Sequence, residues 1–169
     1  VPDIKQARDG LLVNLSETIV SAAWDNSFYL ETDDRISGIR VEKTAHGLSD
    51  DNARANVAGI LCTNSDGERY IEASSAVNFE TGSVKPLFMI ERSLGGGDWN
   101  YQAGTVWPET VSGQKGIFDA FGLNNIGLLV TTTGRVTFAD TNAGYFYMDD
   151  GSILDDGSMH MGVKALGTV

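Results

Sequence analysis

The strongest constraint on this chain is an internal repeat, because short apolar blocks near the N-terminus return in the same order near the C-terminus. The matched blocks, each first-copy segment followed by its counterpart, are 10–13 and 127–130, 18–22 and 135–139, 25–26 and 140–142, 28–31 and 146–149, 33–34 and 149–151, and 38–41 and 162–165. The first pair is identical, GLLV in both copies. Such ordered self-similarity predicts that one structural unit occurs twice.

Alternation with a period of two predicts that the repeated blocks are half-buried antiparallel strands. The side chains expected to face a core are Phe28, Leu30, Ile39, Val41, Phe146, Met148, Val163 and Ala165. Those expected to face outward are Tyr29, Glu31, Arg40, Tyr145, Tyr147 and Lys164. The abundance of glycine, with 20 residues, fits a fold of short strands joined by many turns.

The first copy continues beyond its third strand. Residues 48–55 are polar, with an N-cap candidate at Ser49, and we expect a short helix there. Two more strands are expected near 54–62 and 69–77, joined by the NSDG turn. Three strands, a short helix and two strands form the five-stranded Greek-key barrel of an OB fold. The predicted fold class is therefore all-β, with two OB-like Greek-key β-barrel repeats.

The second copy is predicted to be incomplete, since the sequence reaches Val169 soon after its third strand. An unfinished sheet leaves unpaired backbone groups at its edges and tends to recruit another strand. Three sources remain open: the connection between the copies, residues 1–5 of a neighbouring chain, and residues beyond this sequence. Addition of a strand from one subunit to the next would generate rings or open fibres.

The expected organisation is a first barrel at 1–85, a connection at 86–121 and a partial barrel at 122–169. The connection holds three successive glycines but also many apolar and aromatic residues, among them Trp99 and Trp107. A flexible linker would not carry so many apolar groups. We therefore expect the connection to be ordered and to pack on one or both barrels.

The chain resembles the tandem OB-fold-like repeats of large extracellular proteins from environmental bacteria. The resemblance is carried by residues 92–99, by 122–130, and by 134–136 followed by 146–151. It implies an OB-like fold and an extracellular or cell-surface location, and it says little about function, because a fold name is not a function.

Charge and composition narrow the classes of partner. The net charge of −11, with 12 Lys and Arg residues, opposes contact with phosphate backbones, so a nucleic-acid partner is not expected. It favours solubility and neutral or cationic ligands. A single cysteine, Cys62, excludes an intrachain disulfide, and no apolar run reaches the roughly 18 residues of a membrane span. A start at Val1 suits a processed mature chain or a trimmed one.

Two aromatic–cation pairs are candidate ligand contacts. Tyr29 and Arg40 are expected to lie side by side on the outer face of the first copy, and Tyr147 and Lys164 on the second. This face of an OB fold binds extended ligands, and aromatic rings stack on bases or sugars. The alternative is a cross-strand cation–π pair that stabilises the surface. Trp99 and Trp107 are further candidates for sugar stacking, or else structural residues.

The acidic loops are candidates for Ca²⁺, although their spacing does not match an EF-hand. DDGS occurs twice with a period of six, which brings together Asp149, Asp150, Asp155 and Asp156. The alternative is that these residues are chosen for turn geometry and solubility. No other cofactor is expected.

Nothing in the sequence marks a catalytic site. His46 and His160 stand without a catalytic triad motif, a zinc-binding HExxH or a CxxC, and the triple glycine is not followed by the Lys of a phosphate loop. We expect a protein that is not an enzyme. The preferred function is a secreted structural or assembly module that associates with itself or with another extracellular protein or glycan. A carbohydrate-binding module is the alternative, and a single-stranded nucleic-acid-binding OB domain is less favoured.

Overall fold

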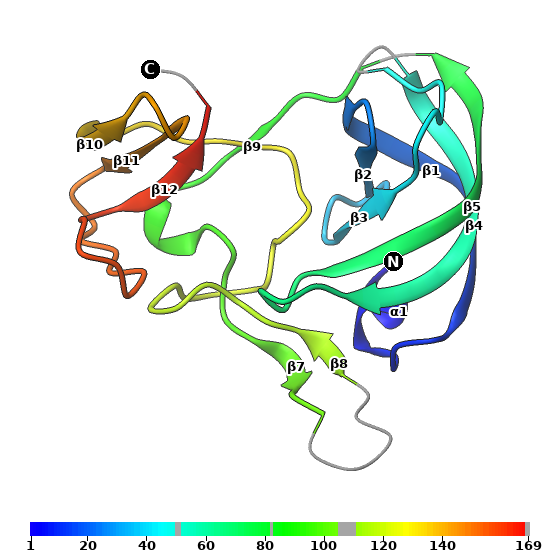
Figure 1. Cartoon of the computed structure of the whole chain (residues 1–169), viewed down its shortest axis with the longest axis horizontal. Helices are drawn as coiled ribbons and strands as arrows, with labels where there is room; N and C mark the ends of the chain where they lie inside the picture. Colours follow the sequence, from blue (N-terminus) through cyan, green and yellow to red (C-terminus); the bar gives the residue numbers. More distant parts are fainter. Residues whose placement is uncertain (50–51, 82, 105–110, 168–169) are drawn as a thin grey trace.

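The structure of the chain is a computed structural model that describes residues 1–49, 52–81, 83–104 and 111–167. It is almost all β, as predicted, and consists of a closed barrel, a smaller three-stranded sheet and a connection that runs between them (Figure 1). The barrel lies on the right in this view and the smaller sheet on the left.

The barrel contains the first five strands in the order β1-β2-β3-β5-β4. The strands are β1 Leu12–Trp24, β2 Ser27–Glu31, β3 Gly38–Glu42, β4 Asn52–Thr63 and β5 Arg69–Thr81. Only the β3–β5 pair is parallel within this barrel, and β1 closes the barrel by pairing with β4. This is the OB-like arrangement that the sequence predicts.

The core of the barrel contains the side chains of β2 and β3 that the alternation of the sequence predicts. Phe28, Leu30, Ile39 and Val41 are at most 1% exposed, and they pack with buried side chains of β1, β4 and β5. Tyr29 and Arg40, which alternate with them, are half-buried. Glu31 is fully buried, however, although we expected it to face solvent.

The short helix predicted over residues 48–55 is wrong. Arg54 and Ala55 belong to β4, and residues 43–49 form no helix. The helix lies instead at the N-terminus, where α1 Pro2–Gln6 begins with a proline and an acidic residue. Ile4 packs against the barrel core, and Lys5 is buried. Residues 1–5 therefore do not form a strand for donation to a neighbour.

The connection, here taken as all residues between β5 and β10, contains several short elements in its described part. They are β6 Leu87–Phe88, the 3-10 helix η1 Glu91–Ser93, β7 Trp99–Gln102, β8 Ser112–Gln114 and β9 Val130–Thr131. Strand β6 pairs in parallel with β9, and β7 pairs antiparallel with β8. None of these strands joins the three-stranded sheet.

The second copy forms a sheet of three strands, β10 Arg135–Asp140, β11 Tyr145–Asp149 and β12 Val163–Leu166. Its register matches that of β1, β2 and β3. Tyr29 pairs with Arg40 in the first copy and Tyr147 with Lys164 in the second. The first strand shifts register at the corresponding place in both copies, between Val20 and Ala22 and between Val136 and Phe138. The repeat predicted from sequence is therefore a repeat of this three-stranded unit.

The two copies differ at their first block. Residues 12–13 begin the long strand β1, whereas residues 126–127 form a turn and residue 130 begins the short strand β9. Strand β9 pairs with β6 and not with the second sheet. The break between β9 and β10 means that the second copy has no counterpart of the full length of β1.

The face assignment in the second copy also needs correction. Tyr147 was expected to be exposed but is only 5% exposed, whereas Phe146 and Met148, expected in the core, are half-buried. Residues 150–162, which replace the short turn at 32–37, account for the difference. They bring His160 onto the outer face, where its ring stacks on Phe138 at 3.8 Å and lies 5.1 Å from Tyr147.

Close backbone packing joins the connection to the barrel. A Cβ built on Gly127 would lie 2.6 Å from the carbonyl carbon of Gly38, and Gly127 has a φ of +92°. Nearby, the Leu129 amide donates to the buried Glu31 carboxylate, which also pairs with Arg35 at 3.0 Å. The connection therefore covers Glu31, which explains why this side chain is buried.

A buried arginine joins residues 111–114 of the connection to the barrel. Arg69 is 1% exposed and donates to Asp9 at 2.5 Å and to the Val111 carbonyl at 3.3 Å. Gln114 accepts a hydrogen bond from the Arg69 amide and donates to the Gly67 carbonyl at 3.1 Å. These bonds join the N-terminal segment, the β4–β5 turn and β8.

The two copies should differ in their tolerance of a core truncation. Phe28→Ala should lower the free energy of unfolding by about 3–5 kcal/mol, because it opens a cavity in a closed core. Phe146→Ala should cost less, since that side chain is half-buried on an open sheet. Urea denaturation followed by circular dichroism measures both, and an equal or reversed ranking would contradict the burial described here.

Gly127→Ala should loosen the connection from the barrel. The added Cβ meets the backbone of Gly38 and strains a residue with positive φ, so we expect a cost above about 1 kcal/mol. Gly144→Ala is a matched control, because Gly144 also has positive φ but its added Cβ meets nothing within 4 Å. Limited proteolysis of residues 115–134 should accelerate in the first variant alone, and equal rates would refute the proposed contact.

Candidate functional site

The predicted outer-face pair of the first copy is present, but its polar groups bond within the protein. Tyr29 Oη donates to Glu68 Oε1 at 2.7 Å, and Arg40 lies 3.5 Å from Glu68 Oε2 and 3.1 Å from Glu42. Burial and the Glu68 charge raise the pKa of Tyr29. Glu68 was missed from the sequence because it belongs to a turn far along the chain.

The connection occupies part of the surface where an OB ligand was expected. A hollow of about 320 Å³ is lined on one side by Trp24, Tyr29 and Glu68 and on the other by residues 126–130. Trp24 remains 58% exposed beside Tyr29, with the two rings edge to face at 5.9 Å. The space left for an extended ligand at Tyr29 is therefore bounded by the chain itself.

A buried lysine, Lys5, lies within electrostatic reach of Glu68. Lys5 is 1% exposed, and its Nζ donates to the Ile126 carbonyl at 2.8 Å. The pKa of Lys5 is lowered to about 7, chiefly by burial; the charge of Glu68 opposes this change and the charge of Arg69 adds to it. Near neutral pH this amine is thus only partly charged, and it still holds residue 126 against the barrel.

The equivalent pair in the second copy is arranged differently. Tyr147 and Lys164 are cross-strand neighbours as predicted, but Tyr147 is covered by Phe138 and His160. Lys164 Nζ lies 4.2 Å from the centre of the Tyr145 ring instead, in a cation–π contact. A flat ring that is covered in this way cannot stack on a ligand without movement of residues 150–162.

The tryptophan candidates do not form one surface in the described residues. Trp99 begins β7 and is half-buried. Trp107 lies outside the residues that the structure describes. The most exposed described tryptophan, Trp24, belongs to the end of β1.

The four acidic candidates separate into two pairs. Asp155 and Asp156 accept hydrogen bonds from the amides of Gly157 and Ser158 at 2.9 Å, which is the turn geometry proposed as their alternative role. Asp149 and Asp150 also accept hydrogen bonds from amides of their own turn, from Ile153 at 3.3 Å and from Ser152 at 2.9 Å, and in addition they approach Glu91 of the connection. One carboxylate oxygen from each of these three residues lies within 4.8 Å of the others.

Glu91 and Asp150 are joined by reciprocal hydrogen bonds. The Glu91 amide donates to Asp150 Oδ2 at 2.8 Å, and the Asp150 amide donates to Glu91 Oε2 at 3.0 Å. Glu91 is fully buried, and its second oxygen, Oε1, has no hydrogen-bond partner in the described structure. Burial raises the pKa of Glu91 to about 7, an effect that the Asp150 amide opposes and the charges of Asp150 and Asp149 reinforce. No local motif marked Glu91, so sequence analysis missed it.

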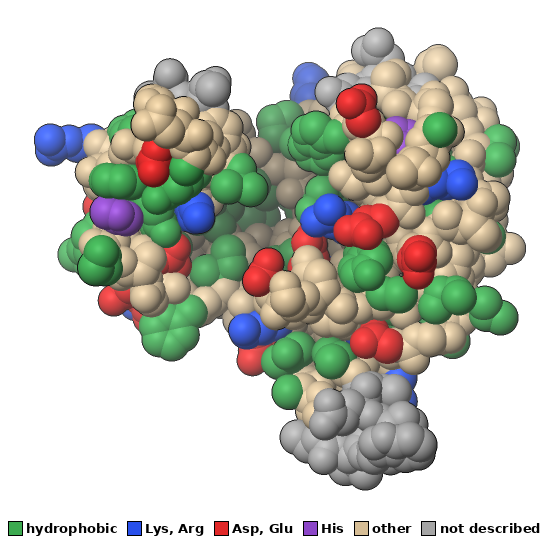
Figure 2. Space-filling model, in the orientation of Figure 1, with side chains coloured by type: hydrophobic (Ala, Val, Ile, Leu, Met, Phe, Trp, Pro, Cys, Tyr) green, Lys and Arg blue, Asp and Glu red, His purple; other side chains and the backbone are tan. Residues whose placement is uncertain are grey.

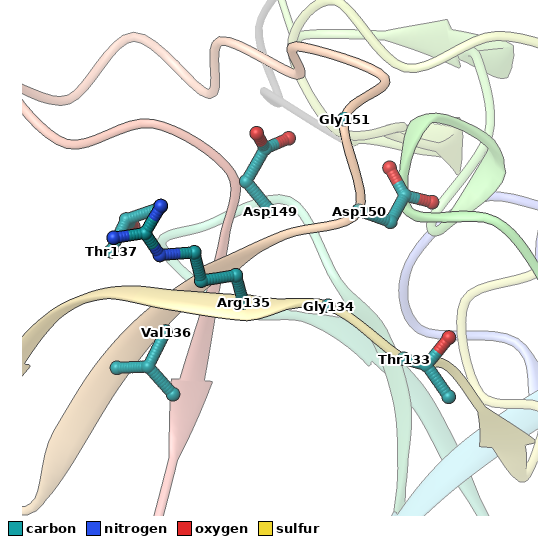
Figure 3. Close-up of a pocket in the computed structure, with 8 residues that line it drawn as sticks. All are labelled: Thr133, Gly134, Arg135, Val136, Thr137, Asp149, Asp150 and Gly151. Carbon is teal, nitrogen blue, oxygen red and sulfur yellow. The ribbon is translucent and has the colours of Figure 1, made fainter.

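An open hollow of about 690 Å³ adjoins these carboxylates. Its lining residues are Thr133, Gly134, Arg135, Val136, Thr137, Asp149, Asp150 and Gly151. Figure 3 shows that the Arg135 side chain extends toward Thr137 and away from Asp150. The cluster is therefore accessible from solvent through Asp149 and Asp150, while Glu91 lies beneath.

Both histidines are engaged in local packing. His46 Nε2 lies 2.6 Å from the Trp24 carbonyl oxygen, and the Leu48 amide donates to its Nδ1 at 3.0 Å. His160 stacks on Phe138. Burial raises the pKa of the partly exposed Cys62 thiol, which lowers its reactivity at neutral pH.

Comparisons with protein-family models, with curated proteins and with solved structures find no significant match to this chain. Within the described residues, none of the helices has the length and apolar character needed to cross a bilayer. Any function must therefore be argued from the geometry described above.

Lys5 should make stability depend on pH in the alkaline range. Its pKa is about 7 in the folded chain and near 10.5 when unfolded, so between these values the unfolded chain binds more protons and stability falls as pH falls. The slope from one proton is about 1.4 kcal/mol per pH unit. Below about pH 7 the loss of stability caused by Lys5 no longer changes with pH, and above pH 10.5 it disappears.

Lys5→Met should remove this dependence. Denaturant unfolding at pH 7 and pH 9.5 should show a larger gain with pH for the original chain than for the variant. Comparison of the two proteins cancels the contributions of other groups that titrate in this range. Equal gains in both would mean that Lys5 keeps its ordinary pKa and is not desolvated.

Proposed function

We propose that this chain is a non-catalytic, extracellular structural module that assembles with further copies of itself through the open edges of the β10–β12 sheet. One observation carries the proposal. In the barrel, β1 pairs with β4 and β3 pairs with β5, whereas the corresponding strands β10 and β12 are edges in the described structure. Unpaired strand edges are templates for pairing with another chain.

Apolar exposure on the same lobe supports the proposal. Leu166 on β12 is 83% exposed and Val136 on β10 is 42% exposed. Figure 2 shows several hydrophobic side chains on the surface of this lobe, on the left. Pairing of one strand with the next chain would bury these groups as well as the free backbone groups.

A second apolar area supports association more generally. Five exposed side chains line or border one hollow of about 500 Å³ between the β2–β3 turn and the connection. They are Ile36, Phe88, Ile90, Phe121 and Leu123, exposed by 48% to 85%. Contiguous exposed apolar side chains of this kind are typical of protein-binding surfaces.

A second copy is the occupant that the sheet favours. Its two edges differ in sequence, so pairing of β12 in one copy with β10 in the next is heterologous and continues into rings or open fibres. The net charge of −11 opposes this contact at low ionic strength. Assembly should therefore strengthen as salt screens the repulsion.

Carbohydrate binding is the second candidate, favoured by the exposed ring of Trp24 beside Tyr29. Flat aromatic side chains can stack on sugar rings, and neutral glycans are compatible with an acidic surface. Retention on insoluble polysaccharide that is lost in Trp24→Ala would support this function. Nucleic-acid binding is less favoured because of the net charge.

Leu166→Lys should weaken assembly at least tenfold, because it places a charge beside the proposed paired edge. Sedimentation velocity over a concentration series at low and high salt measures the association. Leu12→Lys is the matched control, since Leu12 is 80% exposed on a strand of the closed barrel. It should associate like the original chain.

A monodisperse monomer at the highest soluble concentration in high salt would overturn the assembly function. Equal weakening by both lysine variants would also contradict it, because the effect would then follow from charge alone and not from the β12 edge.

A further inference from the structure

Among the described residues, four charged side chains are almost completely buried: Lys5, Glu31, Arg69 and Glu91. Burial of a charge is unfavourable unless a partner compensates it. Glu31 pairs with Arg35, and Arg69 pairs with Asp9. Lys5 donates to a backbone carbonyl and lies within electrostatic reach of Glu68.

Glu91 is the exception, because the charged groups nearest to it have the same sign. Its carboxylate lies against Asp149 and Asp150, and the described structure contains no ion pair to any of the three. The unpartnered Glu91 Oε1 belongs to the fully buried member of the group. This oxygen lies beside Gly134, and no hydrogen-bond donor of the described residues reaches it. A buried carboxylate that lies next to two further carboxylates and has no ion pair would be compensated by a positive ligand.

We propose that Glu91, Asp149 and Asp150 bind one Ca²⁺ ion between η1 and the end of β11. The spacing fits, because Ca²⁺ ligands lie about 2.3–2.6 Å from the ion and opposite ligands are then separated by roughly twice that distance. The three oxygens lie within 4.8 Å of one another. Three carboxylates and an irregular loop suit Ca²⁺, which accepts six to eight oxygens in flexible geometry. Water entering by the adjoining hollow would supply the remaining ligands.

Gly134 leaves room for the side chain of Glu91, the buried residue of the proposed site. A Cβ at this position would lie 2.5 Å from Glu91 Oε1 and 3.0 Å from the Asp149 carbonyl oxygen. A side chain there would displace the Glu91 carboxylate from its place against β11. A glycine immediately before β10 is therefore part of the geometry that brings the connection and the sheet together.

The ion would fasten the connection to the second sheet, as Arg69 and Lys5 fasten it to the barrel. This inference is independent of the assembly function, since a chain that stays monomeric could still bind the ion. Calcium binding by a chain that stays monomeric would support the calcium site and count against the assembly function. Assembly of a chain that binds no calcium would do the opposite.

The direct test is calorimetric titration of the metal-free chain with CaCl₂, with MgCl₂ as the comparison ion. We expect one Ca²⁺ site, weaker or no Mg²⁺ binding, and an affinity in the range of extracellular modules, about 10⁻⁴–10⁻³ M. Glu91→Gln and Asp149→Asn should each weaken Ca²⁺ binding at least tenfold. The double variant Asp155→Asn with Asp156→Asn is the control, because these residues accept turn hydrogen bonds in the same loop, as Asp149 and Asp150 do, but are not grouped with Glu91. It should bind Ca²⁺ normally.

Thermal unfolding gives a second test that does not depend on measurable binding heat. In EDTA, Glu91→Gln should melt at a higher temperature than the original chain, because it removes one of three repelling carboxylates. In saturating Ca²⁺ the order should reverse, since the original chain alone gains from the ion.

Two results would overturn the proposal. One is a Glu91→Gln variant that is more stable than the original chain in both conditions, which would identify Glu91 as a buried acid without a metal. The other is Ca²⁺ binding that survives both single variants and is lost in the Asp155 and Asp156 double variant, which would move the site to the outer turn.

Discussion

The arrangement of this molecule depends on charged side chains that are buried where the connection meets a sheet. Arg69 and Lys5 join the connection to the barrel, Glu31 receives the amide of Leu129, and Glu91 meets the end of β11. Each of these groups would cost several kcal/mol if it were buried without a partner. Their bonds therefore favour one path for the connection over the many paths that apolar contacts alone would allow.

That path changes the surface of the barrel. In an OB fold the outer face of the second and third strands is available to an extended ligand. Here residues 126–130 lie along this region, and Tyr29 and Arg40 share the carboxylate of Glu68. The same segment that joins the two copies thus limits the face on which a ligand was expected.

The two copies illustrate how one local pattern can serve two packing arrangements. Both use the same cross-strand register and the same irregularity in the first strand. In the first copy, β4 and β5 close a core over Phe28. In the second, the long β11–β12 loop covers the opposite face and buries Tyr147 under His160. Burial is then decided by which segment covers a face, and not by alternation alone.

Much of the local structure was determined by the sequence itself. Alternation identified the buried side chains of β2 and β3, and the repeated blocks identified β10, β11 and β12, because period-two patterns and turn residues act over a few positions. The burial of Glu31 and Tyr147, the docking of α1 and the meeting of Glu91 with Asp150 were decided by tertiary structure. Tyr147 is covered by the loop that follows it, whose path is not given by the alternation of the strands. The other three depend on segments far apart in the chain, and 59 positions separate Glu91 from Asp150. No local pattern in one sequence encodes such a distant contact, since it exists only after the connection has folded back between the two sheets.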